Sequence, residues 1–342
     1  MSKSTFQLGM LRGWHRPLLV TAALMYCLVL VSAVGLLADD RLILGDPVWL
    51  KPLKFGFAIG TYSLTLSWLL TKLTKGSRLA WWAGAVFAVA GTLDVGAVTL
   101  AAANGTFSHF NHNTDPVART VQTTFQFGVL PLLLMTLVIS ILVLIQRTGD
   151  LPTSRALRFG LGLAAASMAV AAWLSASAGA TPRTVTDANG HAVSMIGGHG
   201  IGDPDGHGMP ITGWSTTGGD LRVPHFAGLH AIQFLLLVTA ILAVLAKRVN
   251  RLRDERVRAR LVGIAGLGCT GVFAVLTWQA KRGQSLIHPD RQTLTAFAAI
   301  AVFTVLATIA ATAAALDDEP RIPIRPPGSS TARASRCHTG RR

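Results

Sequence analysis

Residues 17–38 read PLLVTAALMYCLVLVSAVGLLA and contain no charged side chain. A bilayer core is crossed by about 20 apolar residues in a helix. The stretch therefore predicts a transmembrane helix. Arg12 and Arg16 precede it, and Val31-Ser32-Ala33 resembles a cleavage site, so a signal peptide is the alternative. The apolar run continues to Ala38, which suits a retained anchor better.

Seven further segments resemble this one in length and hydropathy. We therefore expect an all-α, polytopic transmembrane bundle of about eight helices within residues 1–316. The second segment is the shortest and most polar. The expected helices cover residues 17–38, 53–70, 79–103, 123–145, 156–178, 226–246, 261–280 and 293–316.

Composition agrees with a lipid environment. The chain is 51% hydrophobic and 14% charged, with a mean hydropathy of +0.47. Soluble domains usually carry about 25% charged residues. The net charge of +15 would suit nucleic acid, but the charges lie in short runs between apolar segments. We therefore expect the lipid bilayer of a bacterial plasma membrane as a partner, and no nucleic acid.

Lysine and arginine predict the orientation, because cytoplasmic loops carry an excess of both. With a cytoplasmic N-terminus, the inner segments hold 22 of the 31 Lys and Arg residues and the outer segments hold nine. Both termini are therefore expected in the cytoplasm. Residues 317–342 are predicted to form a disordered basic tail. Residues 179–224 form a Gly- and His-rich outer loop without strand or helix periodicity, which predicts a functional lid or a disordered segment.

Histidines gather on the predicted outer side, where eight of the ten lie. For four of them, His191, His199, His207 and His288, an ordinary polar loop is a sufficient explanation. His109, His225 and His230 lie at or near helix ends and could bind a metal ion, because neutral imidazole is the commonest protein metal ligand. His225 and His230 would point about 140° apart on a regular helix. They would therefore not chelate one ion as a simple pair.

Other polar groups surround these histidines. His230 and Gln233 share a helix face. Asn111 and Asp220 could support metal ligands from an outer shell. Basic and amide side chains near the same helix ends could attract an anionic substrate or lipid headgroup, although snorkelling from helix ends is the simpler alternative. These candidates for substrate binding are Lys51, Lys54, Arg222, Gln279 and Arg282, with Lys281 beside them.

Asp94 lies near the middle of the third predicted helix. A carboxylate at that depth costs about 2.5–3.5 kcal/mol on insertion scales, and such residues are functional by default. It would lie roughly 20 Å from His109 along the helix. Asp94 is therefore expected to form the floor of a cavity or one step of a proton path. Together with Asn111, Asp220 and Gln233, it is a candidate catalytic residue.

Four motifs resemble those of a family of bacterial polytopic membrane proteins to which no activity is attached. They are Trp49 to Phe55 (WLKPLKF), Ser108 to Asn111 (SHFN), Gly218 to Gln233 (GGDLRVPHFAGLHAIQ, with Gly213-Trp214-Ser215 before it) and Trp278 to Gln284 (WQAKRGQ). The resemblance spans most of residues 49–290. It implies the same site residues and names no reaction.

Three functions remain open. The first is a membrane enzyme or redox protein with a metal ion or haem b at the outer face, although no H-x-x-x-H or H-E-x-x-H spacing is present. The second is a proton-coupled transporter or a lipid- or anion-binding protein. The third is a sensor or assembly factor that uses the basic loop 247–260. The chain contains no Walker A motif, no G-x-S-x-G elbow and no C-x-x-C pair. The oligomeric state is not predicted.

Overall fold

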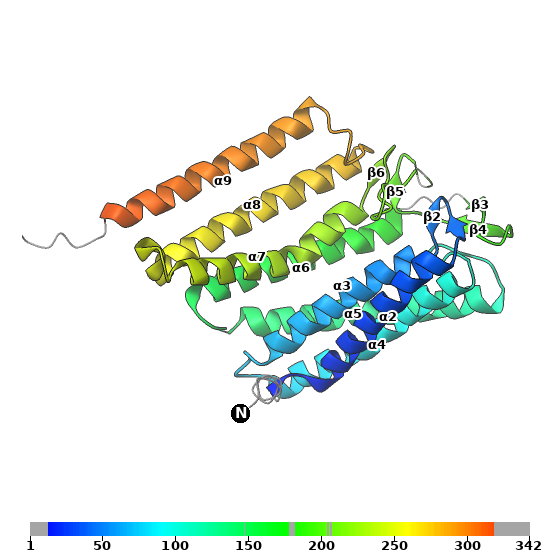
Figure 1. Ribbon diagram of the computed structural model, residues 1–342, viewed down its shortest axis with the longest axis horizontal. Coiled ribbons are helices and arrows are strands. Elements are labelled where there is room, and N and C mark those ends of the chain that lie inside the picture. Colours follow the sequence, from blue (N-terminus) through cyan, green and yellow to red (C-terminus); the bar gives the residue numbers. More distant parts are fainter. Residues whose placement is uncertain (1–12, 147, 178–181, 204, 206, 318–342) are drawn as a thin grey trace, which may run out of the picture.

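The computed structural model describes residues 13–146, 148–177, 182–203, 205 and 207–317, and the predicted basic tail lies almost wholly outside them. Eight long α-helices make up most of this part of the chain (Figure 1). They are α2 (Arg16–Ala38), α3 (Leu50–Leu70), α4 (Ser77–Ala103), α5 (Pro116–Leu144), α6 (Leu151–Ser177), α7 (Arg222–Leu245), α8 (Glu255–Lys281) and α9 (Arg291–Asp317).

Six of these helices are long and apolar enough to cross a membrane, namely α2, α4, α5, α7, α8 and α9. Large apolar side chains cover their outer surfaces. Leu37 of α2 is 88% exposed and Phe127 of α5 is 69% exposed. Soluble monomers rarely expose such large apolar areas. The chain therefore folds as an all-helical, multi-pass membrane protein, as its composition predicts.

Several helices begin earlier than hydropathy alone predicts, because polar caps extend them beyond the apolar span. The carboxylate of Asp115 accepts a hydrogen bond from the Ala118 N–H, and Pro116 occupies the first turn of α5. Asp254 caps α8 in the same manner. These two helices start at residues 116 and 255, where residues 123 and 261 were expected.

The helices form two halves that lie side by side (Figure 1). In the first half α2 packs on α3, and α4 packs on α5. In the second half α6 packs on α7 and α8, and α9 packs on the outer side of α8. An apolar cluster joins the halves through Leu66 of α3, Leu161 of α6 and Ile232 of α7, all at most 1% exposed. The contact between the two halves is therefore apolar around these three residues.

A close approach of α6 and α7 positions the beginning of α7. A Cβ atom added at Gly228 would lie 2.6 Å from the Cβ of Ser167, which is closer than real Cβ contacts allow. The absence of a side chain at this position lets the two backbones meet. This contact holds the first turns of α7, which carry Arg222 and His225, against α6.

The loop between α6 and α7 contains short strands, although its sequence shows no strand periodicity. Strand β3 (Pro182–Thr186) pairs with β4 (Ala192–Ile196), and β5 (Gly200–Ile201) pairs with β6 (Gly219–Asp220). The guanidinium of Arg183 joins Asp205 to the carbonyl of Gly197. With β1 (Leu42–Ile43) and β2 (Asp46–Pro47), these strands cover one end of the bundle, called the strand end below (Figure 1).

Candidate functional site

Four basic side chains converge at the strand end, and we name them the basic cluster: Lys51, His109, His199 and Arg222. Lys51 begins α3, His109 follows α4, His199 precedes β5 and Arg222 begins α7. Each residue is half-buried. The cluster therefore draws on both halves of the bundle and on the loop that covers them.

His109 lies at the centre of the cluster. Its Nδ1 is 3.1 Å from Lys51 Nζ and 3.0 Å from Ser108 Oγ. When Lys51 is protonated its ammonium only donates hydrogen bonds, so Nδ1 then acts as the acceptor and the neutral ring carries its proton on Nε2. The rings of Phe125 and Phe55 pack beside the imidazole, with centroid distances of 4.3 and 5.9 Å. These contacts hold the ring in one orientation.

His199 is the residue that sequence reasoning missed, because it was explained as part of a polar loop. Its ring centroid lies 5.9 Å from that of His109 and 4.9 Å from that of Phe110. Its Nδ1 is buried and has no hydrogen-bond partner among the described residues. Phe110 has a φ of 61°, which is uncommon for a bulky residue. Such backbone outliers cluster at binding and active sites.

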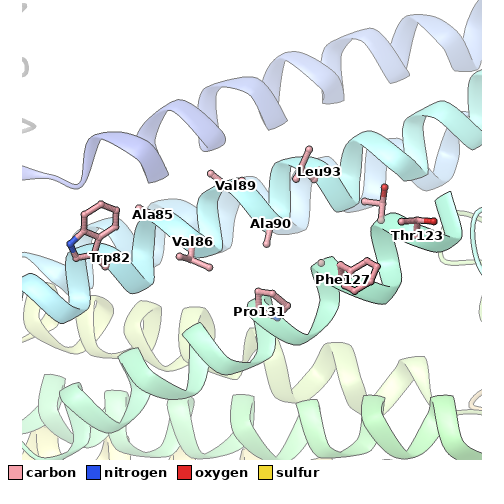
Figure 2. Close-up of a pocket in the computed structure, with 11 residues that line it drawn as sticks. Trp82, Ala85, Val86, Val89, Ala90, Leu93, Thr123, Phe127 and Pro131 are labelled. Carbon is pink, nitrogen blue, oxygen red and sulfur yellow. The ribbon is translucent and has the colours of Figure 1, made fainter. Parts of the chain in front are cut away.

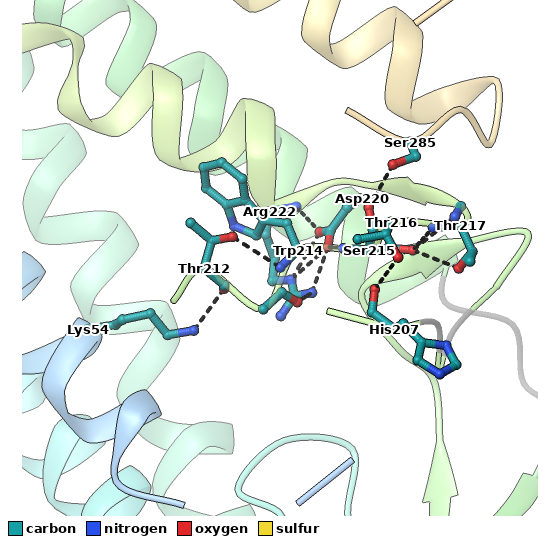
Figure 3. Close-up of polar contacts among 12 residues, drawn as sticks. Lys54, His207, Thr212, Trp214, Ser215, Thr216, Thr217, Asp220, Arg222 and Ser285 are labelled. Carbon is teal, nitrogen blue, oxygen red and sulfur yellow. Dashed lines mark hydrogen bonds and ion pairs between the residues drawn. The ribbon is translucent and has the colours of Figure 1, made fainter. Parts of the chain in front are cut away.

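Arg222 is held by Asp220. Its Nη2 donates to Asp220 Oδ2 at 2.6 Å and its Nε donates to Oδ1 at 3.0 Å. Nη2 also donates to the carbonyl of Gly213, again at 2.6 Å. Asp220 is 2% exposed and accepts a further bond from the Ser215 N–H, as Figure 3 shows. Asp220 therefore positions the guanidinium.

Basic side chains outnumber carboxylates around the cluster. Lys54 donates to the Thr212 carbonyl at 2.8 Å (Figure 3). A side chain added at Gly213 would meet both Lys54 Nζ and Asp46 Oδ2. Asp46 thus lies near Lys54, and Asp220 pairs with Arg222. Within the described part of the chain, no carboxylate forms an ion pair with Lys51. The amino group of Lys51 is therefore left without a carboxylate partner.

The two histidines are neutral at physiological pH. Burial, followed by the charges of Lys51 and Arg222, holds the pKa of His109 well below its ordinary value of 6.5. Burial also lowers the pKa of His199 well below that value, and the nearby charges of Arg222 and Lys51 lower it further. The cluster therefore combines cations with neutral imidazoles that can donate or accept hydrogen bonds.

The predicted metal ligands have different surroundings. His225 Nδ1 lies 2.9 Å from the Ser167 carbonyl on α6, whereas the ring of His230 stacks on Phe226 with a centroid distance of 6.1 Å. His109 contacts Lys51 instead. In the regions that the structure describes, no group of three His, Cys, Asp or Glu side chains lies close enough to hold a metal ion. The expected three-histidine site is not assembled.

Other predicted site residues have structural partners. The amide of Asn111 donates to the Phe107 carbonyl, and its oxygen accepts from the Asn113 N–H. Gln233 Nε2 donates to Thr65 on α3, and its oxygen is buried without a partner among the described residues. Buried Gln279 donates to the Ser285 carbonyl.

Arg282 pairs with Asp290 and lies over the ring of Trp278, 4.3 Å from its centroid. Neither Gln279 nor Arg282 has a contact with the basic cluster among those found in the described residues.

Asp94 lies far from the basic cluster, as its position along α4 predicts. Its side chain faces α5, where a Cβ atom added at Gly128 would overlap its Oδ1. That oxygen is buried and has no hydrogen-bond partner in the described residues. Beside it, a shallow apolar groove runs between α4 and α5 and is lined by Leu93, Phe127 and Pro131 (Figure 2). Asp94 therefore lies at a contact between two helices.

Comparisons of the chain with protein-family models, with curated proteins and with solved structures find no match. The family resemblance based on the four motifs stays a prediction.

Proposed function

We propose that the protein is a multi-pass membrane protein that binds an anionic ligand at its strand end, through the basic cluster. Lys51 carries this proposal, because the residue is half-buried and its Nζ contacts an imidazole nitrogen in place of a carboxylate. A buried charge without a counter-ion is costly. An anion bound at this position would supply the missing charge.

The other members of the cluster suit the same ligand. Arg222 is fixed by Asp220 and retains donor capacity, because the guanidinium has five N–H groups in a rigid fork. His199 Nδ1 is buried without a partner among the described residues. A tetrahedral oxyanion such as phosphate offers several acceptors to such a set of donors. The ligand is therefore inferred to be a phosphate-like group, either free or part of a larger molecule.

The orientation of the helices in the membrane determines on which side of it the basic cluster lies. The excess of Lys and Arg in the inner segments supports cytoplasmic termini, eight membrane crossings with α3 and α6 included, and a strand end that faces out of the cytoplasm. Phosphate-like ligands outside the cell, or on outer-leaflet lipids, would then reach the cluster. The bacterial plasma membrane is the proposed location.

Titration with inorganic phosphate tests this proposal. Wild-type protein and the variant Lys51→Met would be purified in mild detergent, and binding would be measured by calorimetry. Lys75→Met is the matched control, because Lys75 is exposed at the opposite end of the bundle. A hydrogen bond to a charged group contributes about 1.5–3 kcal/mol, so Kd should rise about tenfold or more in Lys51→Met and stay unchanged in Lys75→Met.

An equal Kd in all three proteins would refute the proposal. Metal analysis and an absorption spectrum of the same samples address the metal and haem b hypothesis separately. Stoichiometric metal, or a Soret band that is lost in His109→Ala, would assign the cluster to a metallocentre instead.

Proton-coupled transport is a second candidate. The basic cluster lies where the two four-helix halves meet, since Lys51 and His109 belong to one half and Arg222 to the other. Asp94 supplies a carboxyl within the bundle for coupling. Phosphate uptake into proteoliposomes that depends on a pH gradient in wild type, and that is lost in Asp94→Asn, would support transport. Phosphate binding without phosphate uptake would argue against transport and favour a receptor or an enzyme.

A further inference from the structure

A pocket of about 440 Å³ lies beside the basic cluster, between α7 and α8. Its walls include Val223, Phe226, Ala227 and His230 of α7, Leu276 of α8 and Trp214 of the covering loop. His230 is the one ionisable side chain among the described residues that line it. The pocket is thus almost entirely apolar and suits a hydrocarbon chain.

Helix geometry relates this pocket to the cluster. At about 100° per residue, Gln233 lies about 20° around α7 from Arg222, and Gln233 bonds to Thr65 of α3. Arg222 is therefore directed toward α3, where Lys51 and Lys54 lie. Among the pocket residues of α7, Phe226 lies nearest to Arg222 around the helix axis, at about 40° from it. The stacked rings of Phe226 and His230 line the pocket on this side of the helix.

The same face of α7 continues toward the lipid. Ala227 lies about 140° around the helix from Arg222, and Phe234 lies about 120° around it, on the same side. Phe234 is 51% exposed and Leu237 is 58% exposed. The pocket therefore opens on the outward, apolar surface of the bundle, whereas Arg222 faces the first half. A molecule in both places would have a charged end and an apolar end.

We propose that the anionic ligand is an amphiphile, with its phosphate-like headgroup at the basic cluster and one hydrocarbon chain in the pocket between α7 and α8. This inference rests on the proposed function and adds the class of ligand. The pocket lies next to the charged site, because Val223 follows Arg222 in the chain and Trp214 follows Gly213, whose carbonyl accepts from Arg222. It lacks the polar groups that would bind a soluble substrate. The ligand reaches the site sideways, from the outer leaflet of the membrane.

Alkyl phosphates of two lengths test the inference. The affinities of ethyl phosphate and octyl phosphate would be measured for wild type, Ala227→Trp and Ala240→Trp in the same detergent. Ala227→Trp fills the pocket, whereas Ala240→Trp places the same bulk on an exposed site further along α7. Octyl phosphate should bind wild type at least tenfold more tightly than ethyl phosphate. Ala227→Trp should remove this advantage without changing the affinity for ethyl phosphate, and Ala240→Trp should preserve it.

The smaller substitution Ala227→Leu replaces the tryptophan variant if that variant does not fold. It should reduce the affinity advantage of octyl phosphate over ethyl phosphate in part. Equal affinities for the two alkyl phosphates in wild type, or an octyl advantage that survives in both Ala227 variants, would overturn the lipid inference. The proposed function would then still stand if Lys51→Met weakens ethyl phosphate binding. Ethyl phosphate binding that is insensitive to Lys51→Met would overturn both.

Discussion

Lys51 Nζ lies 3.1 Å from Nδ1 of His109, and this contact joins the first turn of α3 to the segment after α4. A lysine usually pairs with a carboxylate when it leaves bulk water. Here its partner is a neutral imidazole, so no carboxylate neutralises the amino group. With Lys51 protonated, the contact also fixes the tautomer of His109, whose remaining N–H is on Nε2. Anion binding is the function that both consequences support.

Acid should destabilise the protein through His199. Its folded-state pKa is well below 6.5, so the unfolded chain binds more protons than the native chain once the pH falls below about 6.5. Stability then decreases as pH falls, by up to about 1.4 kcal/mol per pH unit and histidine, until the folded-state pKa is reached. Thermal unfolding between pH 7.5 and 5 should show a smaller loss in His199→Gln. An unchanged pH dependence would contradict the burial of this imidazole.

Asp220 should matter for binding through Arg222. In Asp220→Asn the guanidinium loses its charged partner and the buried position loses an ion pair, at an expected cost of about 1–3 kcal/mol in unfolding free energy. Phosphate affinity should fall because Arg222 is no longer held in place. The control Asp290→Asn removes an ion pair at the surface and should change neither property. Equal effects of the two variants would show that Asp220 has no special role.

The effects of substitutions at Gly128 and Asp94 on stability should depend on each other. Alanine in place of glycine usually favours a helix, by about 1 kcal/mol. In Gly128→Ala, however, the new methyl group overlaps Asp94 Oδ1, and such overpacking typically costs about 1–3 kcal/mol. Gly162→Ala is the control, because a Cβ at Gly162 meets nothing within 4 Å, and it should be neutral or stabilising. The double variant Asp94→Ala/Gly128→Ala should recover stability relative to Asp94→Ala. Additive effects would argue against the contact.

Membrane orientation can be read from cysteine labelling. With the three native cysteines replaced by serine, His112→Cys places a thiol at the exposed strand end, and Lys75→Cys places one between α3 and α4 at the opposite end. A membrane-impermeant maleimide added to intact cells should label only His112→Cys. Labelling of Lys75→Cys alone would invert the topology and place the basic cluster in the cytoplasm.

Hydropathy predicts the fold class because the signal is local. Each span needs about 20 apolar residues in sequence, and no knowledge of tertiary contacts is required. The helix ends are harder to predict, because capping residues such as Asp115 and Asp254 lie outside the apolar run. The hairpins in residues 182–220 escaped notice because they are short and Gly-rich, and because pairing such as Gly200 with Asp220 joins residues that are distant in sequence.

The basic cluster was predictable only in part. Lys51, His109 and Arg222 lie next to apolar segments, where charge and imidazole are unusual, and they were recognised for that reason. His199 has no such signal. Its position depends on backbone contacts between distant residues: Ile196 donates to the carbonyl of Phe110, and Leu221 donates to the carbonyl of His199. The gathering of histidines on the predicted outer side also suggested a metal site, because the contacts of His225 with Ser167 and of His230 with Phe226 are not visible in the sequence.

Anomalous diffraction from crystals soaked in tungstate tests the central claim most directly, because this tetrahedral oxyanion reveals its own position. We expect one strong peak within hydrogen-bonding distance of Lys51 Nζ, with His199 and Arg222 around it, and no peak there in crystals of Lys51→Met. Tungstate bound elsewhere at saturating concentration, with the basic cluster empty in the wild-type protein, would contradict the account.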